Sequence, residues 1–106
     1  MTSPQPPGIA RILNQEGGVV GGGALLDGCL LVLTCAYVVN AALGLRPKAA
    51  EAPFGRTVQV DFPLQGTKKI PGKIVAWSPL RELGMGDVAV LRLDTRPDGV
   101  VPMRII

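Results

Sequence analysis

The chain has 106 residues, which is the size of one small domain with one modest hydrophobic core. Glycine (14) and proline (10) are frequent and aromatic residues make up only 4%, so we expect many turns, short strands and an aliphatic core. The formal charge of +3 is small and the basic residues are scattered, which argues against a nucleic-acid partner.

The first eight residues, MTSPQPPG, are rich in proline and polar side chains. They do not have the basic stretch and apolar run of a secretory signal, so we expect residues 1–8 to form a disordered N-terminal arm. The domain itself is then expected to span residues 9–106. A chain without a secretory signal is expected to be cytoplasmic.

The first half of the domain predicts three consecutive strands and a helix. IARILNQ (9–15) and GGVVGGGALL (17–26) read as two strands joined at a turn around Gly17. Asp27 and Gly28 are typical of a type I′ hairpin turn, and CLLVLT (29–34) follows as a third strand. AYVVNAAL (36–43) predicts about two helical turns that end at Gly44 and Pro47.

The uncharged stretch 28–45 reaches the lower length limit of a membrane-spanning helix. However, its β-favouring start, its polar residues Thr34 and Asn40, and the turn signal before it favour a strand followed by a short helix. We therefore expect no membrane partner.

The second half predicts three more strands. In RTVQVDF (56–62) apolar and polar residues alternate, which predicts one face toward the core (Val58, Val60, Phe62) and one toward solvent (Thr57, Gln59, Asp61). KIVAW (73–77) should follow a turn at Pro71 and Gly72, and DVAVLRL (87–93) should follow a glycine-containing loop at 84–86. The predicted fold is an all-β, closed, six-stranded antiparallel barrel with one short helix, because closure removes exposed strand edges.

The two cysteines, Cys29 and Cys35, lie six residues apart in what reads as one extended strand. The strand rise would separate them by about 20 Å, whereas a disulfide needs Cα atoms within about 7 Å. We expect two free, buried thiols, as suits a reducing cytosol. The alternative is a catalytic thiol, but the sequence offers no histidine to lower its pKa.

Four further residues are interpreted as structural. Lys68, Lys69 and Lys73 flank the fourth and fifth predicted strands and are expected to act as solvating or edge-protecting charges rather than as a ligand patch. Trp77 ends a predicted strand and is expected in the core.

Two segments together resemble trypsin-like serine peptidases. GGALLDGCLLVLTCAYVV (22–39) is similar to the strands that lead into the family's TAAHC or TCAHVV segment, with Tyr37 in the place of the catalytic histidine. GDVAVLRL (86–93) is similar to the DIALLKL strand, whose aspartate, here Asp87, orients that histidine. The resemblance covers residues 9–104, is closest to the bacterial TCAHVV branch, and implies the N-terminal Greek-key barrel of a two-barrel fold.

The departures from the family concern the catalytic groups. The sequence contains no histidine, and its only serines, Ser3 and Ser78, lie outside any glycine-rich nucleophile loop. A phenol keeps its proton at neutral pH, so Tyr37 cannot replace the general base. We expect its hydroxyl to donate a hydrogen bond to the Asp87 carboxylate. The plainer alternative is that Tyr37 only packs at the helix start and Asp87 only begins a strand.

The resemblance therefore implies a non-catalytic half-domain that binds or regulates other proteins, with no cofactor. A second hypothesis is the N-terminal part of an active endopeptidase, silenced by Tyr37, with its serine on a second barrel. A third is an unrelated small barrel that serves as an interaction module. Under the first hypothesis, the partner is a protein or peptide, a second copy of the chain or a complementary barrel that carries the serine, seated near Tyr37 and Asp87.

Overall fold

The computed structural model describes residues 8–26, 30–46, 53, 55–63, 68–80 and 86–97. Six strands and one helix follow one another along the chain: β1 (Ile9–Leu13), β2 (Val19–Leu25), β3 (Leu31–Thr34), α1 (Ala36–Ala42), β4 (Thr57–Asp61), β5 (Ile70–Leu80) and β6 (Gly86–Leu93). Most of the predicted arm, the turn at residues 27–28, Cys29, Pro47 and Gly84 lie outside the described residues. Gly8 is described, and its carbonyl accepts the N–H of Leu25 at 2.7 Å.

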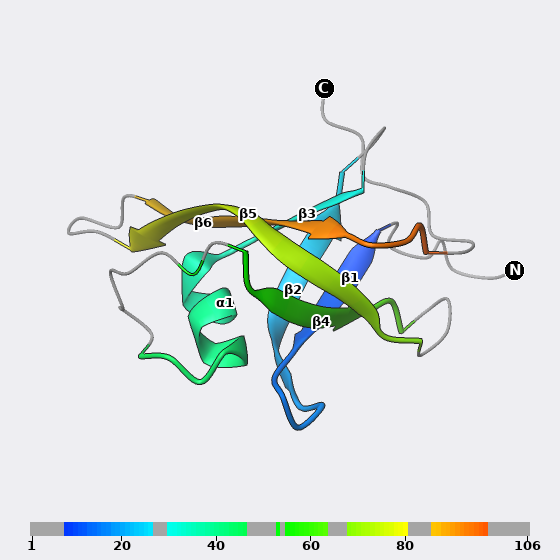
Figure 1. Ribbon diagram of the computed structural model, residues 1–106, viewed down its shortest axis with the longest axis horizontal. Helices are drawn as coiled ribbons and strands as arrows, with labels where there is room; N and C mark the ends of the chain where they lie inside the picture. Colours follow the sequence, from blue (N-terminus) through cyan, green and yellow to red (C-terminus); the bar gives the residue numbers. More distant parts are fainter. Residues whose placement is uncertain are drawn as a thin grey trace, which may run out of the picture.

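The strands form one closed antiparallel barrel with the neighbour order β1-β2-β3-β6-β5-β4. Consecutive strands pair in β1–β2, β2–β3, β4–β5 and β5–β6, while β3 pairs with β6 and β1 pairs with β4 to complete the ring (Figure 1). The six-stranded closed antiparallel barrel with one short helix is thus confirmed.

The barrel interior is aliphatic, as the composition indicates. Its fully buried large side chains come from five strands and the helix and include Ile12, Val32, Val39, Val60, Ile74 and Leu91. The helix α1 contacts β1, β2, β5 and β6 (Figure 1). Trp77 packs against this core as predicted, although it lies inside β5 and not at its end.

The predicted turn at Pro71 and Gly72 is wrong, because both residues belong to β5. Pro71 pairs with Gln59 and Gly72 with Val58. A Cβ atom at Gly72 would lie 3.1 Å from the Cβ of Leu91 on β6, so glycine here allows close packing inside the barrel. Lys73 consequently lies within a strand that is paired on both sides, so the edge-protecting role is wrong for it, while its exposed side chain fits the solvating role.

The predicted solvent-facing position of Asp61 is also wrong. Its side chain is only 4% exposed and forms a two-bond ion pair with Arg11, from Nε to Oδ1 at 2.7 Å and from Nη2 to Oδ2 at 2.7 Å. Arg11 and Asp61 are register partners in the β1–β4 pairing that closes the barrel, so the ion pair links these two strands. The hydrogen bond to Asp61 raises the pKa of Arg11. Val58, Val60 and Phe62 are buried as predicted.

The described helix is short. α1 has seven residues, and no helix in the described part of the chain combines the length and apolar character needed to cross a membrane.

Candidate functional site

The group that caps the N-terminus of α1 comes from another part of the chain. Cys35 is the N-cap residue with extended backbone (φ −101°, ψ 145°), but its side chain makes no capping hydrogen bond. The first turn also has no acidic residue. The free backbone N–H groups of this turn therefore need an acceptor from elsewhere.

Asp87 supplies that acceptor from β6. Its Oδ1 accepts the backbone N–H of Tyr37 at 2.8 Å, across fifty residues of sequence. Asp87 has a left-handed backbone (φ 60°) and follows Gly86, which is also left-handed (φ 86°). Aspartate is among the few residues other than glycine that tolerate this region, so the pair of residues turns the carboxylate toward the helix.

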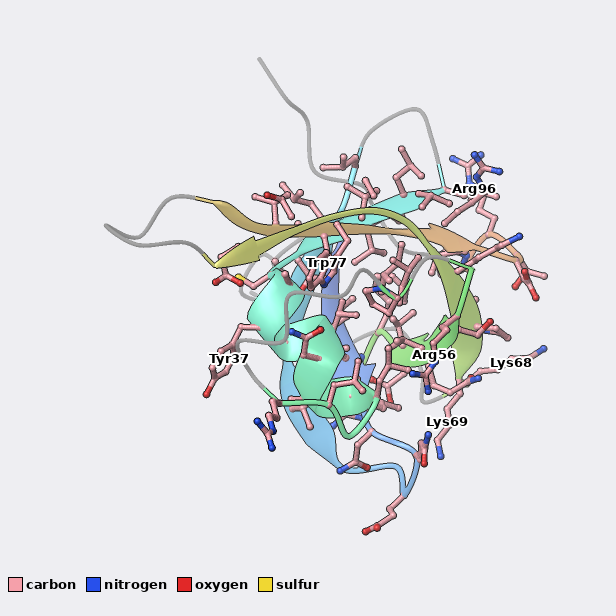
Figure 2. The ribbon with its side chains drawn as sticks, turned by 60° about the vertical axis from the view of Figure 1, so that its left-hand side comes forward. Tyr37, Arg56, Lys68, Lys69, Trp77 and Arg96 are labelled. Atoms are coloured by element: carbon pink, nitrogen blue, oxygen red, sulfur yellow. The ribbon has the colours of Figure 1, made fainter. Side chains whose placement is uncertain are left out.

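The structure thus brings the two predicted site positions together through a different atom from the one expected. The predicted donor was the Tyr37 hydroxyl, whereas the observed donor is its backbone nitrogen. The Tyr37 side chain is 46% exposed and its ring points away from the barrel (Figure 2). The Tyr37 phenol is therefore accessible to solvent or to a partner, and the Asp87 carboxylate caps the N-terminus of α1.

Cys35 lies beside the same carboxylate. It is exposed, which corrects the prediction of a buried thiol. Inward and outward positions alternate along β3, so Val32 and Thr34 face the core and Cys35 faces outward. Partial burial, the charge of Asp87 and a hydrogen bond to Asp87 together raise the pKa of the Cys35 thiol. A thiol with a raised pKa is protonated at neutral pH and is a poor nucleophile.

The Asp87 contact predicts how fast Cys35 reacts with iodoacetamide. The raised pKa leaves little thiolate at pH 7, so alkylation should be slow there and should accelerate as the pH rises through the thiol pKa. Asp87→Asn removes the negative charge, lowers the thiol pKa and should speed alkylation at pH 7 several-fold. Mass spectrometry of the peptide that contains Cys35 reports the rate, and Asp94→Asn is the matched control. Equal rates in the two variants would show that burial, and not Asp87, raises the thiol pKa.

The capping contact predicts a loss of stability when Asp87 is truncated. Asp87→Ala removes the acceptor of the Tyr37 N–H and places a Cβ-bearing residue without a polar side chain at φ 60°. We expect the free energy of unfolding to fall by about 1–2 kcal/mol. Asp87→Asn keeps an acceptor oxygen and should lose less than half of that. Urea unfolding followed by circular dichroism measures both, and equal losses would show that the hydrogen bond contributes little.

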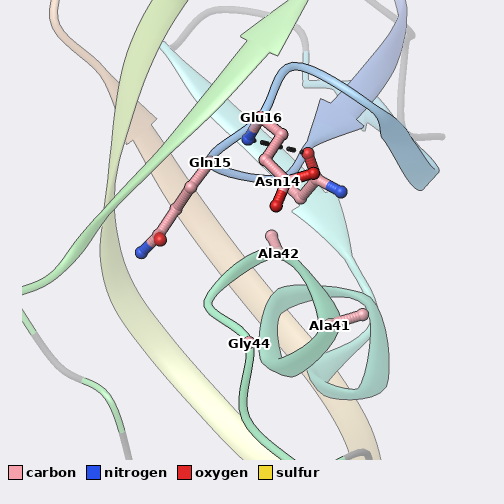
Figure 3. Close-up of a pocket in the computed structure, with 6 residues that line it drawn as sticks. All are labelled: Asn14, Gln15, Glu16, Ala41, Ala42 and Gly44. Carbon is pink, nitrogen blue, oxygen red and sulfur yellow. Dashed lines mark hydrogen bonds between the residues drawn. The ribbon is translucent and has the colours of Figure 1, made fainter.

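A shallow pocket lies at the opposite end of α1. Its volume is about 150 Å³, and it is lined by Asn14, Gln15, Glu16, Ala41, Ala42 and Gly44 (Figure 3). The Asn14 Oδ1 already accepts the backbone N–H groups of Glu16 at 3.0 Å and Gly18 at 2.8 Å. The pocket is smaller than the roughly 300 Å³ at which ligand sites begin and includes neither Tyr37 nor Asp87.

In the described part of the chain, no serine lies in a position to act with Asp87. Ser78 lies on β5 opposite Val88, in a regular strand pairing, while Ser3 lies outside the described residues. Within the ranges that the structure describes, no group of three or more histidine, cysteine, aspartate or glutamate side chains is placed to hold a metal ion. The contact between Cys35 and Asp87 was not predicted. Its only sequence signal is the position of Cys35 two residues before Tyr37.

Comparison of the chain with models of known protein families finds no match, and comparison with curated protein sequences finds none.

Proposed function

We propose that this chain is a non-catalytic barrel of the trypsin-like type whose role is to bind or regulate other proteins. One observation carries the proposal: Asp87 accepts the backbone N–H of Tyr37 at 2.8 Å, while the Tyr37 phenol points outward (Figure 2). The two positions that the resemblance pairs are neighbours, but the contact between them caps a helix. An acid and base that act on a substrate would need side chains that meet.

The strand order supports the trypsin-like part of the proposal. The ring contains the consecutive neighbours β4-β1-β2-β3. A Greek key has this spatial order, in which three hairpin-connected strands are followed by a fourth that returns beside the first. The connection that returns, from β3 to β4, carries α1 and the position of Tyr37.

The side chains around Asp87 support the absence of catalysis. The sequence has no histidine to act as general base. The Cys35 thiol has a raised pKa and is the only described cysteine. A fold of this kind can retain its shape while its sites change, so the barrel is free to serve as a binding surface.

Purified protein is expected not to hydrolyse casein or small ester substrates, and not to react with a serine-directed fluorophosphonate. Tyr37→His should stay inactive as well, because it restores neither a nucleophile nor an oxyanion hole. Trypsin, assayed in parallel, is the positive control. Turnover by the chain or by its Tyr37→His variant would favour the second candidate, a trypsin-like endopeptidase silenced at Tyr37, which the closeness of positions 37 and 87 also supports.

A further inference from the structure

We propose that the outer face of β3, β6 and β5 is a docking surface for an acidic protein segment that also carries apolar side chains. This inference rests on the proposed role in protein binding and adds the surface and the chemistry of the partner. The three strands are neighbours in the ring, in the order β3-β6-β5 (Figure 1).

The register of these strands places an apolar row across the face. Leu33 on β3 pairs with Val90 on β6, and Val90 pairs with Ala76 on β5. Leu33 and Val90 face outward, since the residues that flank them are buried, and Ala76 is exposed. Leu33 is 41% exposed, and Val88, the next outward residue on β6, is 43% exposed. The row is therefore a continuous apolar strip.

The strip extends beyond these three strands. Leu33 also pairs with Ala24 on β2, and Ala24 pairs with Ile9 on β1, which is 43% exposed. Five strands thus contribute an apolar residue to one register row. A large exposed apolar surface is a common mark of an interaction site on a small protein.

A basic row lies directly beside the strip. Arg92 is the next outward residue on β6 after Val90, and it pairs with Lys73 on β5. Both side chains are exposed. Like charges opposite each other on adjacent strands are destabilising, so this pairing is unfavourable for the isolated barrel. Among the described residues the ion pair formed is that of Arg11 with Asp61, which leaves Arg92 and Lys73 without a carboxylate partner.

Charge complementarity selects the partner. The two register rows, Leu33–Val90–Ala76 and Leu31–Arg92–Lys73, include no acidic side chain, and the exposed Asp94 follows directly after β6. A second copy of the same face would bring a second Arg92 and a second Lys73 into the contact, and like charges disfavour that arrangement. A nucleic acid would bring negative charge, but aliphatic side chains offer its bases no aromatic ring for stacking. A protein segment with carboxylates beside apolar side chains satisfies both rows.

The test selects short random peptides, displayed on phage, against the immobilised full chain. We expect the selected sequences to be enriched in aspartate or glutamate together with aliphatic or aromatic residues. A selected peptide is then synthesised with a fluorophore, and its dissociation constant is measured by anisotropy. Lys73→Glu/Arg92→Glu should weaken binding by roughly ten-fold or more, and Leu33→Ser should do the same without a charge change.

The matched control is Lys68→Glu/Lys69→Glu, which reverses two charges elsewhere on the surface. These lysines precede β5 (Figure 2). A Cβ at Gly17 in the β1–β2 turn would lie 3.2 Å from the Lys69 Nζ, which places Lys69 beside that turn. We expect this control to change the dissociation constant by less than about two-fold relative to the parent protein, compared with roughly ten-fold for Lys73→Glu/Arg92→Glu. Circular dichroism of each variant confirms folding. Amide shift changes on peptide binding should concentrate on β3, β5 and β6.

Four results would overturn the proposal: selection of basic or purely polar peptides, binding that survives Lys73→Glu/Arg92→Glu, tighter binding of a single-stranded oligonucleotide at this face, or self-association through it in light scattering. Peptide binding that maps to another face would reject this surface and leave the proposed binding role intact. Hydrolytic activity would reject the proposed function, while the affinities of the surface variants would still stand.

Discussion

Replacing Gly23 with alanine is expected to lower the free energy of unfolding by about 1–3 kcal/mol. Gly23 lies in β2, where an added Cβ would sit 2.8 Å from Cγ1 of Val32 and 3.0 Å from the backbone oxygen of Leu33. Val32 is fully buried, and the carbonyl belongs to the neighbouring strand, so neither can move without disturbing the core or the β2–β3 pairing.

The control for this prediction is the adjacent glycine. Among the residues that the structure describes, a Cβ at Gly22 would meet only the Ala10 oxygen, at 3.6 Å, which is an ordinary contact. Gly22→Ala also reduces the freedom of the unfolded chain, so its stability should stay within about 0.5 kcal/mol of the parent protein or rise slightly. Urea unfolding of the two variants gives the comparison. Similar losses in both would show that the strand tolerates no alanine, whatever the local space.

Breaking the Arg11–Asp61 ion pair is expected to have the second large effect. Arg11→Met leaves the Asp61 carboxylate, which is 4% exposed, without its partner, and an unpaired buried charge is strongly unfavourable. We expect the midpoint of thermal unfolding to fall by several degrees. Asp61→Asn should cost less, because the Arg11 side chain is 38% exposed and can turn toward water.

The double variant Arg11→Met/Asp61→Val separates charge burial from packing. It removes both charges at once and should recover much of the loss caused by Arg11→Met, which gives a large coupling in a double-mutant cycle. Arg46→Met removes one exposed positive charge on the loop after α1 and serves as the control, with no expected change. A double variant less stable than Arg11→Met would show that the two effects are independent.

Local patterns were sufficient to predict the strands and the helix. Alternation and turn residues placed β1, β2, β3, β4 and β6 within a few residues of their observed limits, and the closure of the ring followed from the number of short strands. The turn predicted at Pro71 and Gly72 was wrong because turn propensity is local, whereas their place in β5 depends on Leu91 and Val58 of the neighbouring strands. Tertiary contacts override a local signal of this kind.

For the candidate site, the sequence predicted which residues lie together but not which of their atoms make contact. The resemblance indicated Tyr37 and Asp87, and the structure places them together, but sequence does not say whether a side chain or a backbone group will use the carboxylate. The predictions for Asp61 and Cys35 were wrong for a related reason. Alternation predicts which face of a strand a residue occupies, but the ion pair that buries Asp61 involves Arg11, fifty residues away. The residue type alone suggested that Cys35 is buried. However, Cys35 lies two residues after the outward-facing Leu33, and this alternation indicates that it is exposed.

The order of strands around the ring also divides the chain into two consecutive three-stranded halves, 9–34 and 57–93. Within each half every strand pairs with its neighbour in sequence, and the halves meet at two seams, β3 with β6 and β1 with β4. The covalent link between them runs only through α1 and the segment that follows it. A nick in that segment would remove no strand pairing, and the entropy of joining two fragments would be the main loss. Because α1 contacts strands of both halves, the fragment that retains it would carry the surface on which the other half reassembles.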